Sequence, residues 1–121
     1  MKNNKKIWDK AELIAIDYMQ KKWYKLITTN FKFWKVWEID LIFSSQDKRI
    51  IFVEVKYRSS ERFWMWEESI NFFKKRKLLK TIQNYCFLEK IDLENIRFDV
   101  ISIEKKQKSY RLTHYKNESL E

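Results

Sequence analysis

The most constraining feature of this sequence is a ten-residue stretch, residues 49–58, which reads RIIFVEVKYR. Most of it is β-branched or aromatic, which is typical of a strand that is buried on both faces. Such a strand cannot exist alone, because its backbone needs neighbouring strands and its two faces need covering layers. The stretch therefore predicts a sheet with residues 49–58 at its centre.

The rest of the chain supplies the elements that such a sheet needs. Residues 10–22 carry apolar side chains at helical spacing, and residues 67–89 indicate a longer helix with Phe73 directed inward. Further strands are expected at residues 24–30, 36–44, 96–104 and 108–115. The predicted order is α-β-β-β-α-β-β, which favours an α/β sandwich around a mixed sheet.

Length and charge limit the class of protein. The 121 residues suit a single domain at 1–121, with a short basic tail at 1–6 and a polar tail at 116–121. No apolar run approaches the ~18 residues of a membrane-spanning helix, and the chain start lacks a signal-peptide core. We therefore expect a cytoplasmic protein with no membrane partner. The net charge of +9 favours a nucleic-acid partner, although solubility alone could explain it.

Charged residues interrupt the central strand. Glu54 and Lys56 are two residues apart, so their side chains leave the same face. Asp40 lies on the preceding strand, and an antiparallel hairpin that turns near residues 45–48 brings it opposite Glu54. Two carboxylates at one point could bind Mg²⁺, which prefers oxygen ligands. A buried ion pair, or an edge strand whose charges face solvent, is the alternative, and the spacing leaves both open.

A metal ion at this point would have a clear chemical use. It would lower the pKa of a bound water and stabilise charge on a phosphoryl oxygen, while Lys56 would orient that water or neutralise the transition state. His114 is the only histidine and Cys86 the only cysteine. The sequence therefore excludes histidine-rich metal motifs, thiolate clusters and an internal disulfide.

Three sequence blocks, WEIDLI at 37–42, FVEVKYR at 52–58 and RFDVI at 97–101, resemble the YraN family of small uncharacterised proteins. That family is similar to the PD-(D/E)XK nucleases and to archaeal Holliday-junction resolvases. The resemblance covers about residues 7–117. It implies a restriction-endonuclease-like fold and an Mg²⁺- or Mn²⁺-dependent endonuclease that hydrolyses DNA, with branched or damaged DNA as candidate substrates and a homodimer as the candidate assembly.

The resemblance also implies roles for particular residues. Asp40 and Glu54 correspond to metal ligands, with the carbonyl of Val55 as a third ligand, and Lys56 corresponds to the catalytic lysine. Glu12 matches an extra carboxylate that resolvase-like members bring to the site; an exposed helix charge is its alternative. A non-catalytic nucleic-acid-binding module that retains the nuclease fold remains the alternative for the whole protein.

Several basic residues are candidates for contacts with phosphate. Arg58 at the end of the central strand, and Lys74 and Lys77 on the second helix, could hold a nucleic-acid backbone. A solvated strand end and a solvated helix face are the alternatives. Arg97 and Asp99 are expected to form a structural pair.

The sequence contains six tryptophans and no glycine, although average usage of about 7% predicts roughly eight glycines. In the YraN pattern, the tryptophans stand where glycine occurs or is readily accepted. They are Trp8, Trp23, Trp34, Trp37, Trp64 and Trp66. Trp37 replaces the first residue of Gly-Glu-Ile-Asp-Leu-Ile, and Trp23 stands where a helix C-terminal cap favours glycine. We hypothesise that the source organism reads UGA as glycine; a base-stacking platform and ordinary core aromatics are the alternatives.

Overall fold

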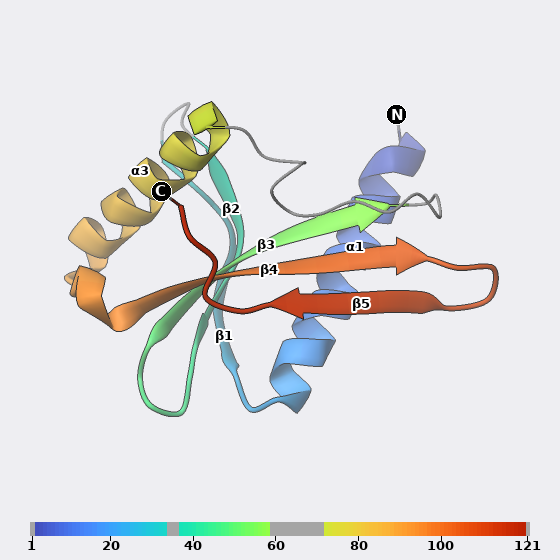
Figure 1. The fold of residues 1–121 in the computed structure, drawn as a ribbon, viewed down its shortest axis with the longest axis horizontal. Helices are drawn as coiled ribbons and strands as arrows, with labels where there is room; N and C mark the ends of the chain where they lie inside the picture. Colours follow the sequence, from blue (N-terminus) through green and yellow to red (C-terminus); the bar gives the residue numbers. More distant parts are fainter. Residues whose placement is uncertain (1, 34–36, 59–71, 121) are drawn as a thin grey trace.

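The computed structural model describes residues 2–33, 37–58 and 72–120. Figure 1 shows a sheet with one helix on each side. The elements are α1 (Lys2–Lys21), β1 (Lys25–Lys32), β2 (Glu38–Ser44), β3 (Ile50–Arg58), α3 (Phe72–Glu89), η1 (Leu93–Asn95), β4 (Ile96–Lys105) and β5 (Tyr110–Tyr115). The predicted α/β class and the order α-β-β-β-α-β-β are confirmed. Neither α1 nor α3 is long and apolar enough to cross a membrane.

The sheet is mixed, and β3 lies at its centre. Its strand order is β1-β2-β3-β4-β5. Neighbouring strands are antiparallel except for β3 and β4, which run parallel. Parallel strands need a long crossover connection, and α3 lies within this one. The apolar stretch at residues 49–58 thus pairs on both sides, as its composition predicts.

Two apolar layers cover the sheet. On one face, Val53 and Val55 of β3 pack with Ala15 and Met19 of α1. On the other face, Phe52 packs with residues of α3, which are Leu78, Ile82, Tyr85 and Cys86. Successive strand residues point to opposite faces. Glu54 and Lys56 therefore share the face of Phe52, on the side of the sheet that α3 covers.

The C-terminal end of α1 has the backbone conformation expected at Trp23. Tyr24 N–H donates to the carbonyl of Met19 at 3.1 Å, and Trp23 N–H donates to that of Gln20 at 3.0 Å. Trp23 has φ 72°, and its side chain is 74% exposed. Glycine is the usual residue at this position of the cap. Lys90 ends α3 in the same conformation, with φ 57°, so this cap also tolerates other residues.

Two local expectations were wrong. Phe73 is 70% exposed instead of pointing inward, because it lies nine residues from buried Ile82 and therefore on the opposite side of the helix. The first helix begins at Lys2 instead of residue 10, since residues 2–9 contain no proline or glycine that would end it.

The polar C-terminal segment is attached to the sheet, because Glu118 N–H donates to the carbonyl of Phe98 at 2.7 Å.

Candidate active site

The β2–β3 hairpin brings Asp40 to Glu54, as the spacing predicts. The two strands are antiparallel, and their ladder extends from Ser44–Ile50 to Leu41–Val53. Asp40 lies one residue beyond the end of this ladder, and its Oδ2 accepts a hydrogen bond from Val55 N–H at 2.8 Å. A side chain thus takes the place of a backbone carbonyl as the acceptor. The Asp40 carboxylate is consequently held between the two strands, beside Glu54.

Glu54 is buried but not fully hydrogen-bonded. Its side chain is 5% exposed, and Lys56 Nζ lies 3.4 Å from Glu54 Oε2. The indole Nε1–H of Trp37 donates to the same oxygen at 3.3 Å. The other oxygen, Oε1, is buried and has no hydrogen-bond partner. A buried carboxylate oxygen without a partner destabilises the folded state by about 1–3 kcal/mol or more. It therefore indicates a binding site and not an interaction that stabilises the fold.

The electrostatics of the pair favour a cation. Burial raises the pKa of Asp40 well above its usual value, and the adjacent Glu54 carboxylate raises it further. The hydrogen bond from Val55 N–H and the charge of Lys56 lower this pKa, but by less. Two carboxylates in contact cannot both ionise cheaply, even with the ammonium of Lys56 3.4 Å from Glu54 Oε2. A divalent cation would supply the missing positive charge.

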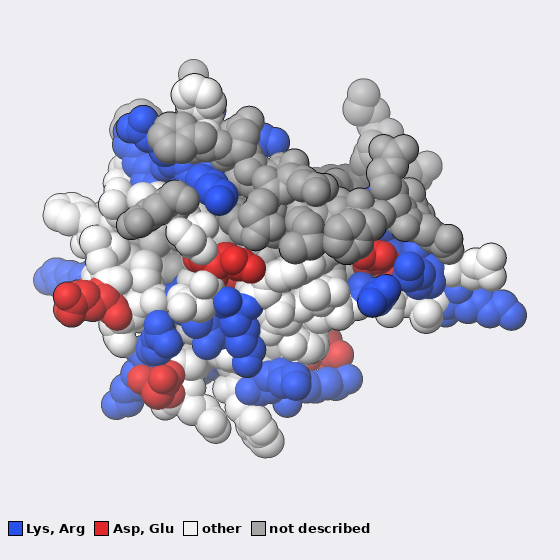
Figure 2. Space-filling view, in the orientation of Figure 1, with Lys and Arg blue, Asp and Glu red and all other residues white. Residues whose placement is uncertain are grey.

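Asp40 and Glu54 open into a surface hollow of about 290 Å³. Its other lining residues are Lys32, Trp37 and Glu38. Figure 2 shows Asp and Glu atoms near the middle of one molecular face, with Lys and Arg atoms above and below them. An acidic hollow within a basic surface can bind a cation and a polyanion side by side.

The residues present fit Mg²⁺ or Mn²⁺. In the described part of the chain, no group of three or more His, Cys, Asp or Glu side chains could hold a metal ion. The protein side chains therefore offer two carboxylates, and Mg²⁺ commonly binds through one or two carboxylates together with waters and substrate phosphates. The unpartnered Glu54 Oε1 provides a ligand atom. The carbonyl of Val55 remains the predicted third protein ligand.

Glu12 lies close to this region but outside the hollow. From α1, its carboxylate accepts from Asn30 Nδ2 at 3.4 and 3.5 Å. Asn30 of β1 lies across from Asp40 of β2, because the residues on either side of Asn30 pair with those on either side of Asp40. Glu12 thus reaches the strand beside Asp40 from the helix that covers the other face. Its role as an additional active-site carboxylate stays a prediction.

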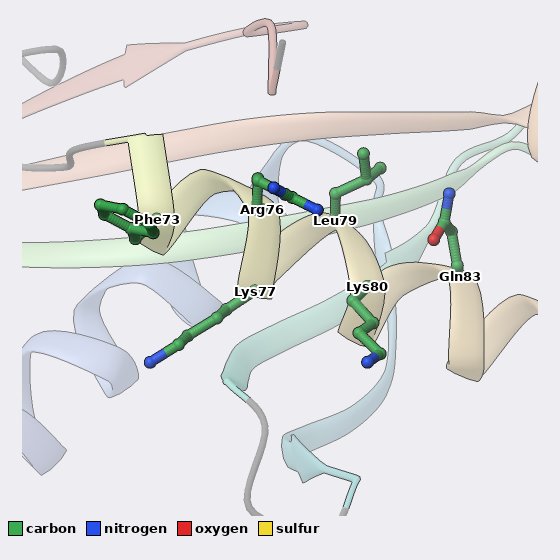
Figure 3. Close-up of a pocket in the computed structure, with 6 residues that line it drawn as sticks. All are labelled: Phe73, Arg76, Lys77, Leu79, Lys80 and Gln83. Atoms are coloured by element: carbon green, nitrogen blue, oxygen red, sulfur yellow. The ribbon is translucent and has the colours of Figure 1, made fainter.

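The predicted phosphate contacts occupy different places. Arg58 ends β3 on the same face as Glu54 and Lys56. Lys74 Nζ lies 6.0 Å from the centre of the Trp37 ring. Lys77 lines a separate hollow on α3 (Figure 3), where Lys77 and Lys80 extend in one direction and Arg76 in another. Arg58 and Lys74 are therefore better placed near the carboxylates than Lys77.

A second buried carboxylate, Asp99 of β4, has a very different environment. Arg97 donates to its two oxygens at 2.9 and 2.8 Å, and Asn117 N–H donates to it at 3.0 Å. His114 Nε2 lies 2.7 Å from Asp99 Oδ2, and the hydroxyl of Tyr18 lies 3.0 Å from His114 Nδ1. Burial alone would raise the pKa of Asp99, but the hydrogen bonds from His114, Arg97 and Asn117 outweigh it and lower the pKa.

Sequence reasoning correctly expected the Arg97–Asp99 pair, but it missed the other partners of Asp99. It also missed three residues around the acidic hollow, namely Lys32, the side chain of Trp37 and Asn30 beside Glu12. Glu38 was recognised only as part of the WEIDLI block. Its place two residues before Asp40 was the available signal, since both side chains then leave the same face of β2.

Comparisons with known proteins give a consistent result. The model of the family described as "Uncharacterised protein family UPF0102" matches residues 11–103. A UPF0102 protein of Alkaliphilus oremlandii is 36% identical over 116 residues, which cover 94% of this chain and 97% of the relative. A UPF0102 protein of Vibrio campbellii is 40% identical over 103 residues, covering 84% and 83%. One from Caldanaerobacter subterraneus subsp. tengcongensis is 39% identical over 101 residues, covering 84% and 81%.

Proposed function

This chain belongs to the uncharacterised protein family UPF0102, and we propose that it is a divalent-metal-dependent endonuclease that hydrolyses DNA phosphodiesters. The observation that carries the proposal is the close pairing of Asp40 with the buried carboxylate of Glu54, whose Oε1 receives no hydrogen bond from an N–H or hydroxyl group of the described residues. Lys56 Nζ lies 3.4 Å from the other oxygen of Glu54. Membership of the PD-(D/E)XK nuclease superfamily, which the YraN-like blocks suggest, is part of this proposal.

Each residue has a defined task in this proposal. Asp40 and Glu54 hold Mg²⁺ or Mn²⁺, assisted by the carbonyl of Val55. When bound, the metal ion makes a water more acidic and stabilises charge on a phosphoryl oxygen. Lys56 would donate a hydrogen bond to the attacking water or to the phosphate, since its side chain is 17% exposed and its Nζ lies 3.4 Å from Glu54 Oε2.

The surroundings of the site suit a nucleic-acid backbone. The chain has a net charge of +9, and Lys32 lines the acidic hollow. Arg58 and Lys74 approach the same face of the sheet, while Lys77 extends the basic surface along α3. Lysines and arginines that replace counterions on phosphates give sequence-independent affinity. DNA in the cytoplasm is the proposed substrate, with branched or damaged DNA as its candidate form and a homodimer as the candidate assembly.

A specific contact favours a second candidate, a nucleic-acid-binding module without catalysis. The indole of Trp37 donates to Glu54, which is one of the two carboxylates that a metal ion needs. A protein in which this contact persists would keep the basic surface and lose the metal. Binding of DNA with no uptake of Mn²⁺ would identify this alternative.

A cleavage assay tests the nuclease proposal. Linear, nicked, flapped and four-way DNA would be incubated with the glycine-restored protein, in which the tryptophans including Trp37 are replaced by glycine, in Mg²⁺, in Mn²⁺ or in a chelator. We expect metal-dependent cleavage that Asp40→Asn and Glu54→Gln abolish. Asp17→Asn is the matched control, because Asp17 is an exposed acid that pairs with Lys21 on α1. Cleavage that survives both site substitutions would place the activity elsewhere.

A further inference from the structure

Trp37 lines the hollow that the carboxylate pair opens into, and its indole contacts one of the two carboxylates. Trp37 immediately precedes β2, and its Nε1–H donates to Glu54 Oε2 at 3.3 Å. The ring also lines the hollow, and Lys74 Nζ lies 6.0 Å from its centre. A single side chain thus lies between the acidic pair and the basic start of α3.

An indole in this position opposes cation binding for two reasons. Its N–H is a donor with no acceptor capacity, so it directs positive charge at a carboxylate oxygen and cannot ligate a metal ion. Its ring also takes space beside Glu54, and Mg²⁺ usually keeps several of its waters when a protein binds it. The indole therefore competes with a cation for Glu54 Oε2 and narrows the space beside it.

The backbone at this position does not depend on the indole. The carbonyl of Trp37 accepts a hydrogen bond from Thr81 Oγ1 at 2.8 Å, and Thr81 is fully buried in α3. A residue without a side chain at position 37 would keep this anchor. Without the indole, Glu54 Oε2 would keep its contact with Lys56 Nζ.

Trp23 gives independent evidence about the tryptophans. Its φ of 72° lies in the left-handed region, which glycine adopts without steric cost. Its ring is 74% exposed and gains little from packing. Trp23 and Trp37 thus suit glycine better than tryptophan for unrelated reasons, one of backbone conformation and one of access to a site. One cause, a glycine codon written as tryptophan, accounts for both positions and for a chain with six tryptophans and no glycine.

We propose that position 37 controls access of a divalent cation to the Asp40–Glu54 pair, and that the natural chain carries glycine there. The cation itself rests on the function proposed above. Glycine at position 37 opens the hollow, frees Glu54 Oε2 from the indole and retains the Thr81 anchor. Tryptophan at the same position keeps Glu54 Oε2 engaged by the indole and weakens cation binding.

Mn²⁺ titration by calorimetry tests this inference on the full chain. Four proteins would be compared: the tryptophan form, Trp37→Gly, Trp37→Phe and Trp23→Gly. We expect Trp37→Gly to bind Mn²⁺ at least about tenfold more tightly than the tryptophan form. Trp37→Phe removes the N–H but keeps a ring, so its affinity should be intermediate. Trp23→Gly is the matched control and should leave the Mn²⁺ affinity unchanged.

The outcomes separate this inference from the nuclease proposal. Equal or weaker Mn²⁺ binding by Trp37→Gly, in a protein with an unchanged circular-dichroism spectrum, would overturn the inference. If the glycine variant unfolds, Trp37→Ala provides the same comparison. Tighter Mn²⁺ binding without DNA cleavage would support the role of position 37 and contradict the nuclease. A UGG codon for residue 37 in the source genome would overturn the assignment of glycine, and a UGA codon together with a glycine-containing peptide in mass spectrometry would support it.

Discussion

Two carboxylate clusters lie on adjacent strands of one sheet, and they differ in how their charge is balanced. Asp99 on β4 is fully buried and receives hydrogen bonds from Arg97 and Asn117, with His114 at 2.7 Å. Glu54 on β3 is also buried, yet one of its oxygens has no partner. The pKa of Asp99 is lowered, whereas that of Asp40 beside Glu54 is raised.

The difference shows that burial alone does not make a carboxylate functional. Both acids interrupt apolar strands, and both cost free energy to remove from water. At Asp99 the fold supplies enough donors to stabilise the charge, so the group is structural. At the Asp40–Glu54 pair it supplies too few, so an external cation has a place. If this distinction is correct, substitutions in the two clusters will affect different properties of the protein.

The largest effect concerns catalysis. Asp40→Asn or Glu54→Gln removes a ligand of the proposed metal, and we expect DNA cleavage to fall by at least about a hundredfold. Asp99→Asn should change the rate per folded molecule by no more than about threefold. Initial rates on the preferred DNA substrate, corrected for the folded fraction, provide the measurement. An equal loss in all three variants would remove the distinction between the clusters.

The second effect concerns stability. Asp99→Ala leaves Arg97 and His114 without their acceptor in the interior, and we expect a loss of about 3–5 kcal/mol in the free energy of unfolding. Urea titration followed by circular dichroism measures it. Asp17→Ala is the matched control, because this exposed acid forms a surface ion pair with Lys21. Its loss should change the free energy of unfolding by less than about 1 kcal/mol. A loss below about 1 kcal/mol for Asp99→Ala would contradict its structural role.

The third effect is an opposite dependence on pH. Because the folded-state pKa of Asp40 is raised, its contribution is most favourable below its ordinary pKa of 3.8 and is lost as the pH rises through the raised value. Asp99 has a lowered pKa, so its contribution is present above 3.8 and is lost as the pH falls. Each group changes stability by up to about 1.4 kcal/mol per pH unit in its own window. Urea titrations of the parent protein, Asp40→Asn and Asp99→Asn across pH would separate the two slopes; slopes of the same sign would be inconsistent with this account.

The smallest effect is a gain in stability. Asp40→Asn removes a partly buried charge next to Glu54 while its amide oxygen can still accept from Val55 N–H. Without a divalent ion at pH 7, we expect this variant to be about 1 kcal/mol more stable than the parent protein. In the Trp37→Gly background, Mn²⁺ should raise the melting temperature of the protein that keeps Asp40 and leave that of the additional Asp40→Asn variant unchanged. A destabilised Asp40→Asn would indicate that the carboxylate pair serves the fold.

Much of the fold was readable from local patterns. The apolar run at residues 49–58 predicted a central strand because few other structures can bury a β-branched segment on both faces. The polar turn after Ser44 set the hairpin, and the two-residue period placed Glu54 and Lys56 on one face. The proximity of Asp40 to Glu54 followed from these features. Phe73 was predicted wrongly because its side of the helix depends on which residues contact the sheet, and an apolar residue alone does not show this.

The order of the elements, the central strand and the residues of the acidic pair follow from the amino-acid sequence, because they depend on short-range periodicity and one hairpin. Which buried carboxylate is saturated with donors depends on the packing of the folded chain. The partners of Asp99 include His114 from the next strand and Asn117 just after that strand, and the indole beside Glu54 comes from a residue 17 positions earlier in the chain. Hydrogen-bond saturation depends on distances of about 3 Å between groups remote in sequence, and no local pattern encodes such distances.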